Sequence, residues 1–88
     1  MYYISVYDIA SEKRLPKVLK TFRKYLFWIQ NSVFEGELNE TQLKSLQEEL
    51  KGIIKKDKDS VLFFSVENKR YVTKKKMGIE KNEPVMFL

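Results

Sequence analysis

Strand-like and helix-like patterns follow one another along the chain as strand, helix, strand, strand, helix, strand, and this order predicts an α+β fold. The expected architecture is a ferredoxin-like βαββαβ sandwich with an extra C-terminal strand, whose antiparallel sheet carries both helices on one face. The length of 88 residues and the hydrophobic content of 43% suit one small packed core. We therefore expect a single domain over residues 1–88, without a linker.

Two different periodicities indicate the first strand and the first helix. Residues 2–8, YYISVYD, alternate in strand fashion and are rich in aromatic and β-branched side chains. Residues 12–26 then carry apolar side chains at every third or fourth position, which marks one face of an α-helix. Ser11 is the expected cap, and Pro16 leaves the exact start of the helix open.

The middle of the chain predicts a β segment followed by a second helix. Residues 28–38, WIQNSVFEGEL, are β-rich, with either a short hairpin or a kink in one strand at residues 31–32. Asn39 and Gln42 have the spacing of a capping box, and helical spacing then continues to about Lys56. The second helix is therefore expected to begin at a defined cap.

Two further strands are expected in the C-terminal third. Residues 55–59 have the composition of a polar turn, and residues 60–67 carry apolar side chains of both parities, as expected for a buried central strand. Residues 70–77 predict a more basic strand. Residues 82–88 end in the short apolar segment PVMFL, which we expect to dock on other structure.

One face of the predicted sheet lacks cover within the chain. We expect the helices to cover the side that bears Ile4 and Val6, which leaves Tyr3, Tyr7 and a phenylalanine of the 60–67 strand on the open face. Sheet-to-sheet dimerisation would cover these side chains. Alternatively, exposed tyrosines would stack nucleobases, as in RNA-recognition modules of this topology. The chain has no RNP-like motif, so we favour the dimer.

Composition excludes several kinds of chemistry. The chain has no Cys and no His, which removes disulfides, thiolate zinc sites, serine-type triads and His-based ribonuclease mechanisms. Only carboxylates remain as metal ligands. No apolar run approaches the roughly 20 residues of a membrane helix, and residues 1–11 lack a basic leader. We expect a cytoplasmic protein without a membrane partner.

Positive charge is concentrated in the first predicted helix. The net charge of the chain is +5, and residues 12–26 carry six basic side chains and one acidic side chain. Residues 70–76 hold a second basic block. This distribution makes nucleic acid the expected partner, against the plainer interpretation of a solvated helix face. The expected phosphate-contacting residues are Lys13, Arg14, Lys17, Lys20 and Lys24.

Asp8 is the candidate for metal chemistry. It ends an otherwise apolar strand and shares the parity of Ile4 and Val6, although capping of the next turn would also explain an acid at this position. Two copies of Asp8 across a homodimer axis would share one Mg²⁺ and activate a water molecule. The lower-ranked alternative ligands are Glu12, Glu35 and Glu37.

Short motifs along the chain carry a family likeness. They are YDI at 7–9, KR at 13–14, KVLK at 17–20, KY at 24–25, IQNSVFEGEL at 29–38 and DSVLFF at 59–64. Together they resemble the Cas2 family, the small ferredoxin-like proteins of CRISPR adaptation. The chain departs from the family pattern at Trp28, where relatives often have Arg, and at Leu26, where they often have Gly.

The resemblance implies a homodimer in which the two sheets face each other and a C-terminal strand reaches the partner, a role for which residues 82–88 are well placed. It also implies that such dimers bridge the Cas1 integrase and hold duplex prespacer DNA during spacer acquisition. Some family members are metal-dependent endonucleases on single-stranded RNA or double-stranded DNA, which implies that Asp8 is the Mg²⁺ ligand here.

Besides Lys17, three further positions match residues implicated in relatives. They are Tyr7, Ser32 and Phe34, for which strand packing and backbone shaping are the alternatives to a catalytic role. Two other functions remain open at this point. One is a purely structural scaffold without catalysis, and the other is a toxin-type ribonuclease of the related virulence-associated family, which shares the fold and a first-strand aspartate.

Overall fold

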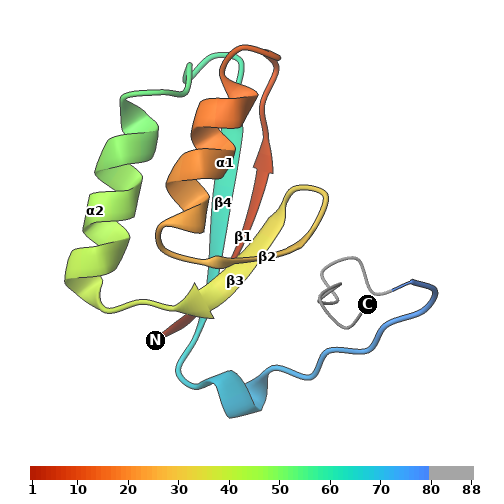
Figure 1. Cartoon of the computed structure of the whole chain (residues 1–88). Coiled ribbons are helices and arrows are strands. Elements are labelled where there is room, and N and C mark those ends of the chain that lie inside the picture. The colour runs from red at the N-terminus through yellow and green to blue at the C-terminus, as the bar shows by residue number, and fades with distance from the viewer. Residues whose placement is uncertain (80–88) are drawn as a thin grey trace.

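Four strands and two helices follow one another in the predicted βαββαβ order (Figure 1). The strands are β1 (Tyr2–Asp8), β2 (Phe27–Gln30), β3 (Val33–Glu37) and β4 (Ser60–Val66), and the helices are α1 (Leu15–Arg23) and α2 (Glu40–Lys51). The computed structural model describes residues 1–79. The sheet has the order β2-β3-β1-β4 with all pairs antiparallel, and both helices lie on one face, which confirms the predicted fold class.

The capping box of α2 is formed as predicted. The Asn39 side chain accepts a hydrogen bond from the Gln42 backbone N–H at 2.7 Å, and the Gln42 side chain accepts one from the Asn39 backbone N–H at 2.9 Å. Two backbone N–H groups that a helix start leaves unpaired are thus satisfied. The helix ends earlier than predicted, because Gly52 is its C-cap.

The helix α1 begins later than the sequence pattern indicated. The Ser11 hydroxyl accepts hydrogen bonds from the backbone N–H groups of Lys13 and Arg14, at 3.1 and 3.3 Å, so it caps a turn that precedes the helix. Regular α-helix starts at Leu15, and Pro16 lies in its first turn, where its missing N–H breaks no helical bond.

Residues 28–38 contain a hairpin, which settles the choice that the sequence left open. Asn31 adopts φ of 42°, a left-handed conformation that Asn tolerates better than most residues and that tight hairpin turns require. Its carbonyl accepts hydrogen bonds from the Tyr7 hydroxyl at 3.3 Å and from the Trp28 indole N–H at 3.1 Å. The turn is therefore anchored to both β1 and β2.

The two faces of β1 are the reverse of those predicted. The side chains that face the helices and are buried are those of Tyr3, Ser5 and Tyr7. Ile4 and Val6 lie on the other face and are half-buried. The prediction was wrong because alternation separates the two faces of a strand without saying which one turns inward. In this fold aromatic rings fill the space beneath the helices.

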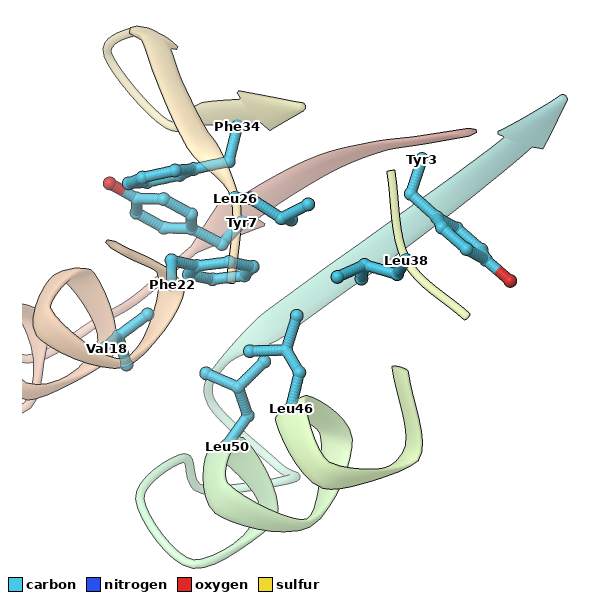
Figure 2. Close-up of a cluster of buried hydrophobic side chains, with 9 residues drawn as sticks. All are labelled: Tyr3, Tyr7, Val18, Phe22, Leu26, Phe34, Leu38, Leu46 and Leu50. Atoms are coloured by element: carbon cyan, nitrogen blue, oxygen red, sulfur yellow. The ribbon is translucent and has the colours of Figure 1, made fainter. Parts of the chain in front are cut away.

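A stack of aromatic rings forms the centre of the core (Figure 2). The rings of Phe22 and Phe34 are stacked with centroids 5.0 Å apart, and Tyr7 stacks on Phe22 at 5.5 Å. Leu46 and Leu50 of α2 belong to the same buried cluster. The core therefore joins α1, α2 and the sheet, and aromatic rings pack in it beside aliphatic side chains.

The other sheet face, here called the open face, is apolar. Residues 68–74 lie beside Tyr2 and Glu35 of this face, whereas the described residues leave its β4 side exposed. Ile4 is paired in register with Phe64, and Val6 with Leu62, so the four side chains lie next to one another. Leu62 and Phe64 are 53% and 56% exposed. An open apolar face was predicted, but the expectation that Tyr3 and Tyr7 line it was wrong, whereas Tyr2 shares the parity of Ile4 and Val6.

Two predictions for the C-terminal third are also wrong within residues 1–79. The strand β4 lies at the edge of the sheet and not at its centre. The strand expected at residues 70–77 is not formed, because Lys69–Tyr71 make a 3-10 turn that the Asn68 side chain caps by accepting the Arg70 N–H at 3.0 Å. The apolar segment at 82–88 lies outside the described residues.

The chain after the 3-10 turn runs away from β4 (Figure 1). Lys74 forms an ion pair with Glu35 of β3, two strands away from β4 in the sheet order. The free edge of β4 is on the side of the sheet away from β3. This segment therefore does not run along the edge where a strand could pair with β4. Among residues 1–79 no helix is long and apolar enough to cross a membrane.

Candidate functional site

Asp8 is the last residue of β1, and it is exposed. Its register partner is Ser60, the first residue of β4, and its parity is that of Ile4 and Val6. The shared parity was predicted, but in the structure it belongs to the open face and not to the core face. The carboxylate therefore lies at one end of the apolar open face.

Asp8 offers the hard carboxylate oxygens that a divalent cation such as Mg²⁺ prefers. The described residues hold no group of three or more side chains of His, Cys, Asp or Glu able to bind a metal ion. Mg²⁺ is commonly held by one or two carboxylates and several waters, so an exposed aspartate is an adequate ligand when a second carboxylate comes from another molecule.

The alternative carboxylates are placed less favourably for metal binding. Glu35 is in an ion pair with Lys74, and Glu37 is in an ion pair with the N-terminal ammonium group. Both carboxylates are therefore engaged by cations of the same chain. Glu12 is exposed and lies in the turn before α1.

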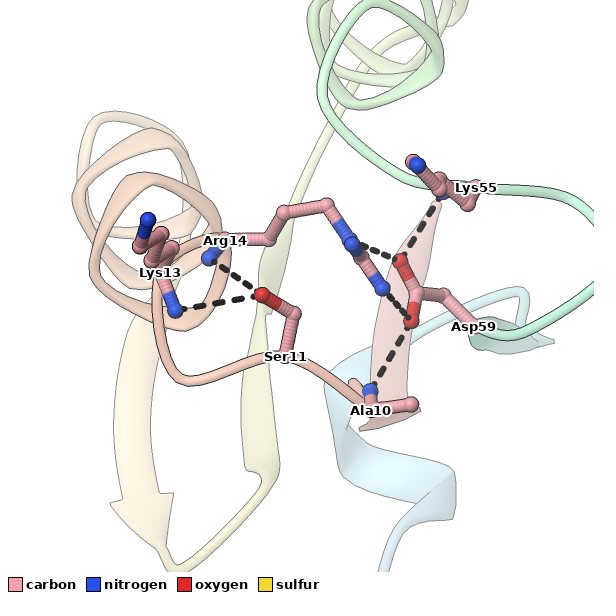
Figure 3. Close-up of polar contacts among 6 residues, drawn as sticks. All are labelled: Ala10, Ser11, Lys13, Arg14, Lys55 and Asp59. Carbon is pink, nitrogen blue, oxygen red and sulfur yellow. Dashed lines mark hydrogen bonds and ion pairs between the residues drawn. The ribbon is translucent and has the colours of Figure 1, made fainter.

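The loops beside Asp8 are organised by Asp59, a carboxylate that sequence reasoning did not single out (Figure 3). The side chain of Asp59 is fully buried. It accepts hydrogen bonds from Arg14 Nε at 2.7 Å and Arg14 Nη2 at 2.9 Å, and from the backbone N–H groups of Ala10 and Lys55, both at 2.9 Å. The Arg14 guanidinium and these N–H groups hold the pKa of Asp59 well below its usual range.

This cluster, the Arg14–Asp59 clamp, joins the loop after β1 to the turn before β4. The loop begins immediately after Asp8, so the clamp fixes the chain direction at the candidate metal ligand. All four hydrogen bonds go to one buried carboxylate, whose burial would otherwise be costly.

The five predicted phosphate-contacting cations fall into two groups. Arg14 is held in the clamp, and Lys24 at the end of α1 is in an ion pair with Glu49 of α2. The other three are exposed and take part in no ion pair within the described residues: Lys13, Lys17 and Lys20. These three side chains are the ones available to a phosphate backbone.

The remaining predicted site residues lie apart from Asp8. Tyr7 and Phe34 are on the helix side of the sheet, and Phe34 is fully buried in the aromatic stack. Burial raises the pKa of the Tyr7 hydroxyl. Ser32 is in the hairpin turn, where its carbonyl accepts the Tyr7 backbone N–H at 3.1 Å. The structure shows packing and turn-shaping contacts for all three, and their catalytic roles stay predictions.

The chain is similar in sequence to proteins of one known family. Residues 1–74 match the family described as CRISPR associated protein Cas2. A protein named CRISPR-associated endoribonuclease Cas2 from Dictyoglomus turgidum is 47% identical over 88 residues, covering 100% of both chains. A protein of the same name from Thermotoga maritima is 43% identical over 83 residues, covering 94% of each chain.

Solved structures give the same result. A crystal structure described as cas2 superimposes with a TM-score of 0.85 at 44% identity, covering 96% of this chain and 93% of the other. Streptococcus pyogenes Cas2 at pH 6.5 superimposes with a TM-score of 0.74 at 29% identity, covering 86% of this chain and 100% of the other. The similarity therefore extends over nearly the whole fold.

Proposed function

This chain belongs to the Cas2 family of CRISPR-associated proteins, and from that premise we propose that it serves spacer acquisition as a homodimer that binds nucleic acid and bridges the Cas1 integrase. We also propose that the dimer is a Mg²⁺-dependent endonuclease on single-stranded RNA or double-stranded DNA. The name endoribonuclease carried by the relatives supports a phosphodiester-cleaving activity.

The observation that carries the proposal is the position of Asp8 at the end of the open face. The open face has exposed Leu62 and Phe64 in register with β1, so its apolar surface is contiguous. Contiguous exposed apolar surface marks an interaction site. A second copy of the same face would cover it, and a two-fold axis near the Asp8 end would bring a second Asp8 to the site.

The residues have distinct roles in this proposal. The two Asp8 carboxylates hold Mg²⁺, which when bound supplies a Lewis acid and a water molecule of lowered pKa. Lys13, Lys17 and Lys20 bind phosphates through charge-assisted contacts that salt weakens. The Arg14–Asp59 clamp holds the loop that follows Asp8.

A scaffold without catalysis is the second candidate function, and the single exposed carboxylate at the site favours it. Hydrolysis needs the metal and a correctly placed water, whereas a scaffold needs only the basic surface and the dimer. The two functions make opposite predictions for Asp8, because a scaffold would retain spacer integration without this carboxylate.

The deciding experiment measures cleavage of single-stranded RNA and of duplex DNA with Mg²⁺, with EDTA as the metal-free control and binding measured in parallel. The proteins are the wild type, Asp8→Asn and the matched control Asp57→Asn, which changes an exposed aspartate in the turn before β4. We expect Asp8→Asn to abolish cleavage and to retain binding, and Asp57→Asn to cleave like the wild type.

Two results would contradict the proposal, the first for the role of Asp8 and the second for the nuclease activity itself. Cleavage by Asp8→Asn at the wild-type rate would remove this residue as the metal ligand. No cleavage by the wild type, together with salt-dependent duplex binding, would leave the scaffold and remove the nuclease. Circular dichroism of each variant checks that the fold is retained.

A further inference from the structure

A pocket of about 430 Å³ opens on the helix side of the molecule, between α1 and the β2–β3 hairpin. Its walls include Leu15 and Leu19 from successive turns of α1, and the rings of Tyr7 and Trp28 from β1 and β2. Arg23, the last residue of α1, supplies a cation at the wall. The pocket and Asp8 lie on opposite faces of the sheet, so it belongs to a different site.

The polar atoms of the two aromatic side chains are already engaged in the fold. The Tyr7 hydroxyl and the Trp28 indole N–H both donate to the Asn31 carbonyl, at 3.3 and 3.1 Å. Tyr7 is buried and stacked in the core, so the aromatic surface that the pocket offers comes mainly from the half-buried Trp28. Such surface binds a flat heteroaromatic ring by stacking, without selecting its hydrogen-bonding edge.

The charge of the pocket favours an anionic ligand. Arg23 is exposed and takes part in no ion pair within residues 1–79, and none of the lining residues is acidic. Arg23 and Tyr7 line the same pocket, and the positive charge of Arg23 opposes the rise that burial causes in the pKa of Tyr7. A guanidinium binds phosphate with two parallel hydrogen bonds.

We propose that this pocket binds one unstacked nucleotide of a single-stranded nucleic acid, with the base against Trp28 and the leucines of α1 and the phosphate on Arg23. The proposal rests on the nucleic-acid binding proposed above. A volume of about 430 Å³ is within the range of small-ligand sites. Lys20 of the same helix is also exposed.

The pocket gives the protein a preference for single-stranded over duplex nucleic acid, which its positive charge alone does not give. Basic side chains bind the phosphates of single strands and duplexes alike. A base in a closed duplex is stacked and paired, so it cannot enter a pocket without the cost of leaving the stack. The pocket therefore selects single strands and open duplex ends. Basic surface residues do not distinguish these from closed duplexes.

Trp28 is the single tryptophan of the chain, and its fluorescence reports directly on this pocket. We would titrate the full-length protein in EDTA with a single-stranded oligothymidylate, an abasic oligonucleotide of equal length, and a duplex closed by a loop at each end. We expect the single strand to quench Trp28. The abasic strand and the closed duplex should bind, as followed by the anisotropy of a label on the nucleic acid, without quenching.

Two variants connect the quenching to the pocket. Arg23→Gln should weaken binding of the single strand by about tenfold, as expected when a charge-assisted phosphate contact is lost. Lys51→Gln, which removes an equal charge at the end of α2, should weaken it much less. Both residues are exposed, and thermal melts confirm that the variants remain folded.

The outcomes separate the pocket from the proposed function. Binding of all three nucleic acids without quenching of Trp28, or equal losses in Arg23→Gln and Lys51→Gln, would overturn the nucleotide pocket and leave nucleic-acid binding intact. If the protein bound none of the three nucleic acids, both the nucleotide pocket and the proposed nucleic-acid binding would be overturned. Quenching by the single strand alone, lost in Arg23→Gln, supports the pocket.

Discussion

The guanidinium of Arg14 meets the carboxylate of Asp59 at two points, with Nε 2.7 Å from Oδ2 and Nη2 2.9 Å from Oδ1. The two residues are 45 positions apart in the chain. Because the carboxylate also binds two backbone N–H groups, one buried side chain fixes both loops at the Asp8 end of the sheet. Arg14, which the sequence groups with the expected phosphate-contacting residues, is thus a structural residue.

Asp59→Asn should lower the melting temperature by about 10 °C or more, because it leaves the Arg14 guanidinium without its partner in a half-buried position. The matched control is Asp57→Asn, an exposed aspartate in the same turn, which should melt within a few degrees of the wild type. Differential scanning calorimetry measures both. Equal melting temperatures for the wild type and Asp59→Asn would show that the clamp does not stabilise the fold.

The clamp also predicts how stability depends on acid. The pKa of Asp59 in the folded protein is below its ordinary value of 3.8, so the unfolded chain takes up the proton first as pH falls. The contribution of the clamp is complete above about pH 4 and is lost as the pH falls through the lower, folded-state pKa.

The melting temperature of the wild type should therefore fall more steeply below pH 4 than that of Asp59→Asn, and the difference between the two proteins should shrink. Melting curves between pH 2 and pH 7 at constant ionic strength test this. A difference that stays constant over this range would mean that the Asp59 carboxylate is not ionised in the clamp.

Lys17 and Arg14 should respond differently in nucleic-acid binding, although the sequence groups them together. Lys17→Gln removes an exposed cation, so the slope of log affinity against log salt on duplex DNA should decrease by about 0.9 for one lost phosphate contact. Arg14→Gln should lower the melting temperature and leave that slope near the wild-type value at temperatures where the variant is folded. A decrease in slope for Arg14→Gln equal to that for Lys17→Gln would show that Arg14 also contacts a phosphate of the nucleic acid.

The fold was predictable because its local signals agree. The Asn39–Gln42 capping box, the apolar spacing of both helices and the hairpin-compatible residues at 31–32 all favour the same topology. The strand expected at residues 70–77 failed for a local reason, since the Asn68 cap and the 3-10 turn change the chain direction before pairing with β4 begins.

The site was less predictable, because it depends on which face of β1 points inward and on contacts distant in sequence. Alternation identified Asp8 together with Ile4 and Val6, but it did not assign that set to the open face. The clamp joins Arg14 to Asp59 across 45 positions of an 88-residue chain, and an aspartate in a lysine-rich turn carries no sequence signal of burial.

Phe64→Lys should prevent dimerisation without unfolding the protein. Phe64 is 56% exposed on the open face, so in the isolated chain a lysine at this position has access to water, whereas in a face-to-face dimer it would bury an unpaired charge. Sedimentation velocity should show a dimer for the wild type and a monomer for Phe64→Lys. The control Thr41→Lys, on the exposed surface of α2, should remain dimeric. A dimeric Phe64→Lys protein would exclude the open face as the interface.

Phe34 offers a way to separate packing from catalysis. Its ring is fully buried and stacked on Phe22, so Phe34→Ala should cost about 3–5 kcal/mol, a large share of the stability of a small domain. Phe34→Leu retains most of the buried volume and should remain folded. If Phe34 acts only by packing, cleavage per folded molecule by Phe34→Leu should equal that of the wild type, with the folded fraction determined by circular dichroism. A folded Phe34→Leu protein without activity would instead support the catalytic prediction, since loss of packing alone leaves the Asp8 site on the opposite face unchanged.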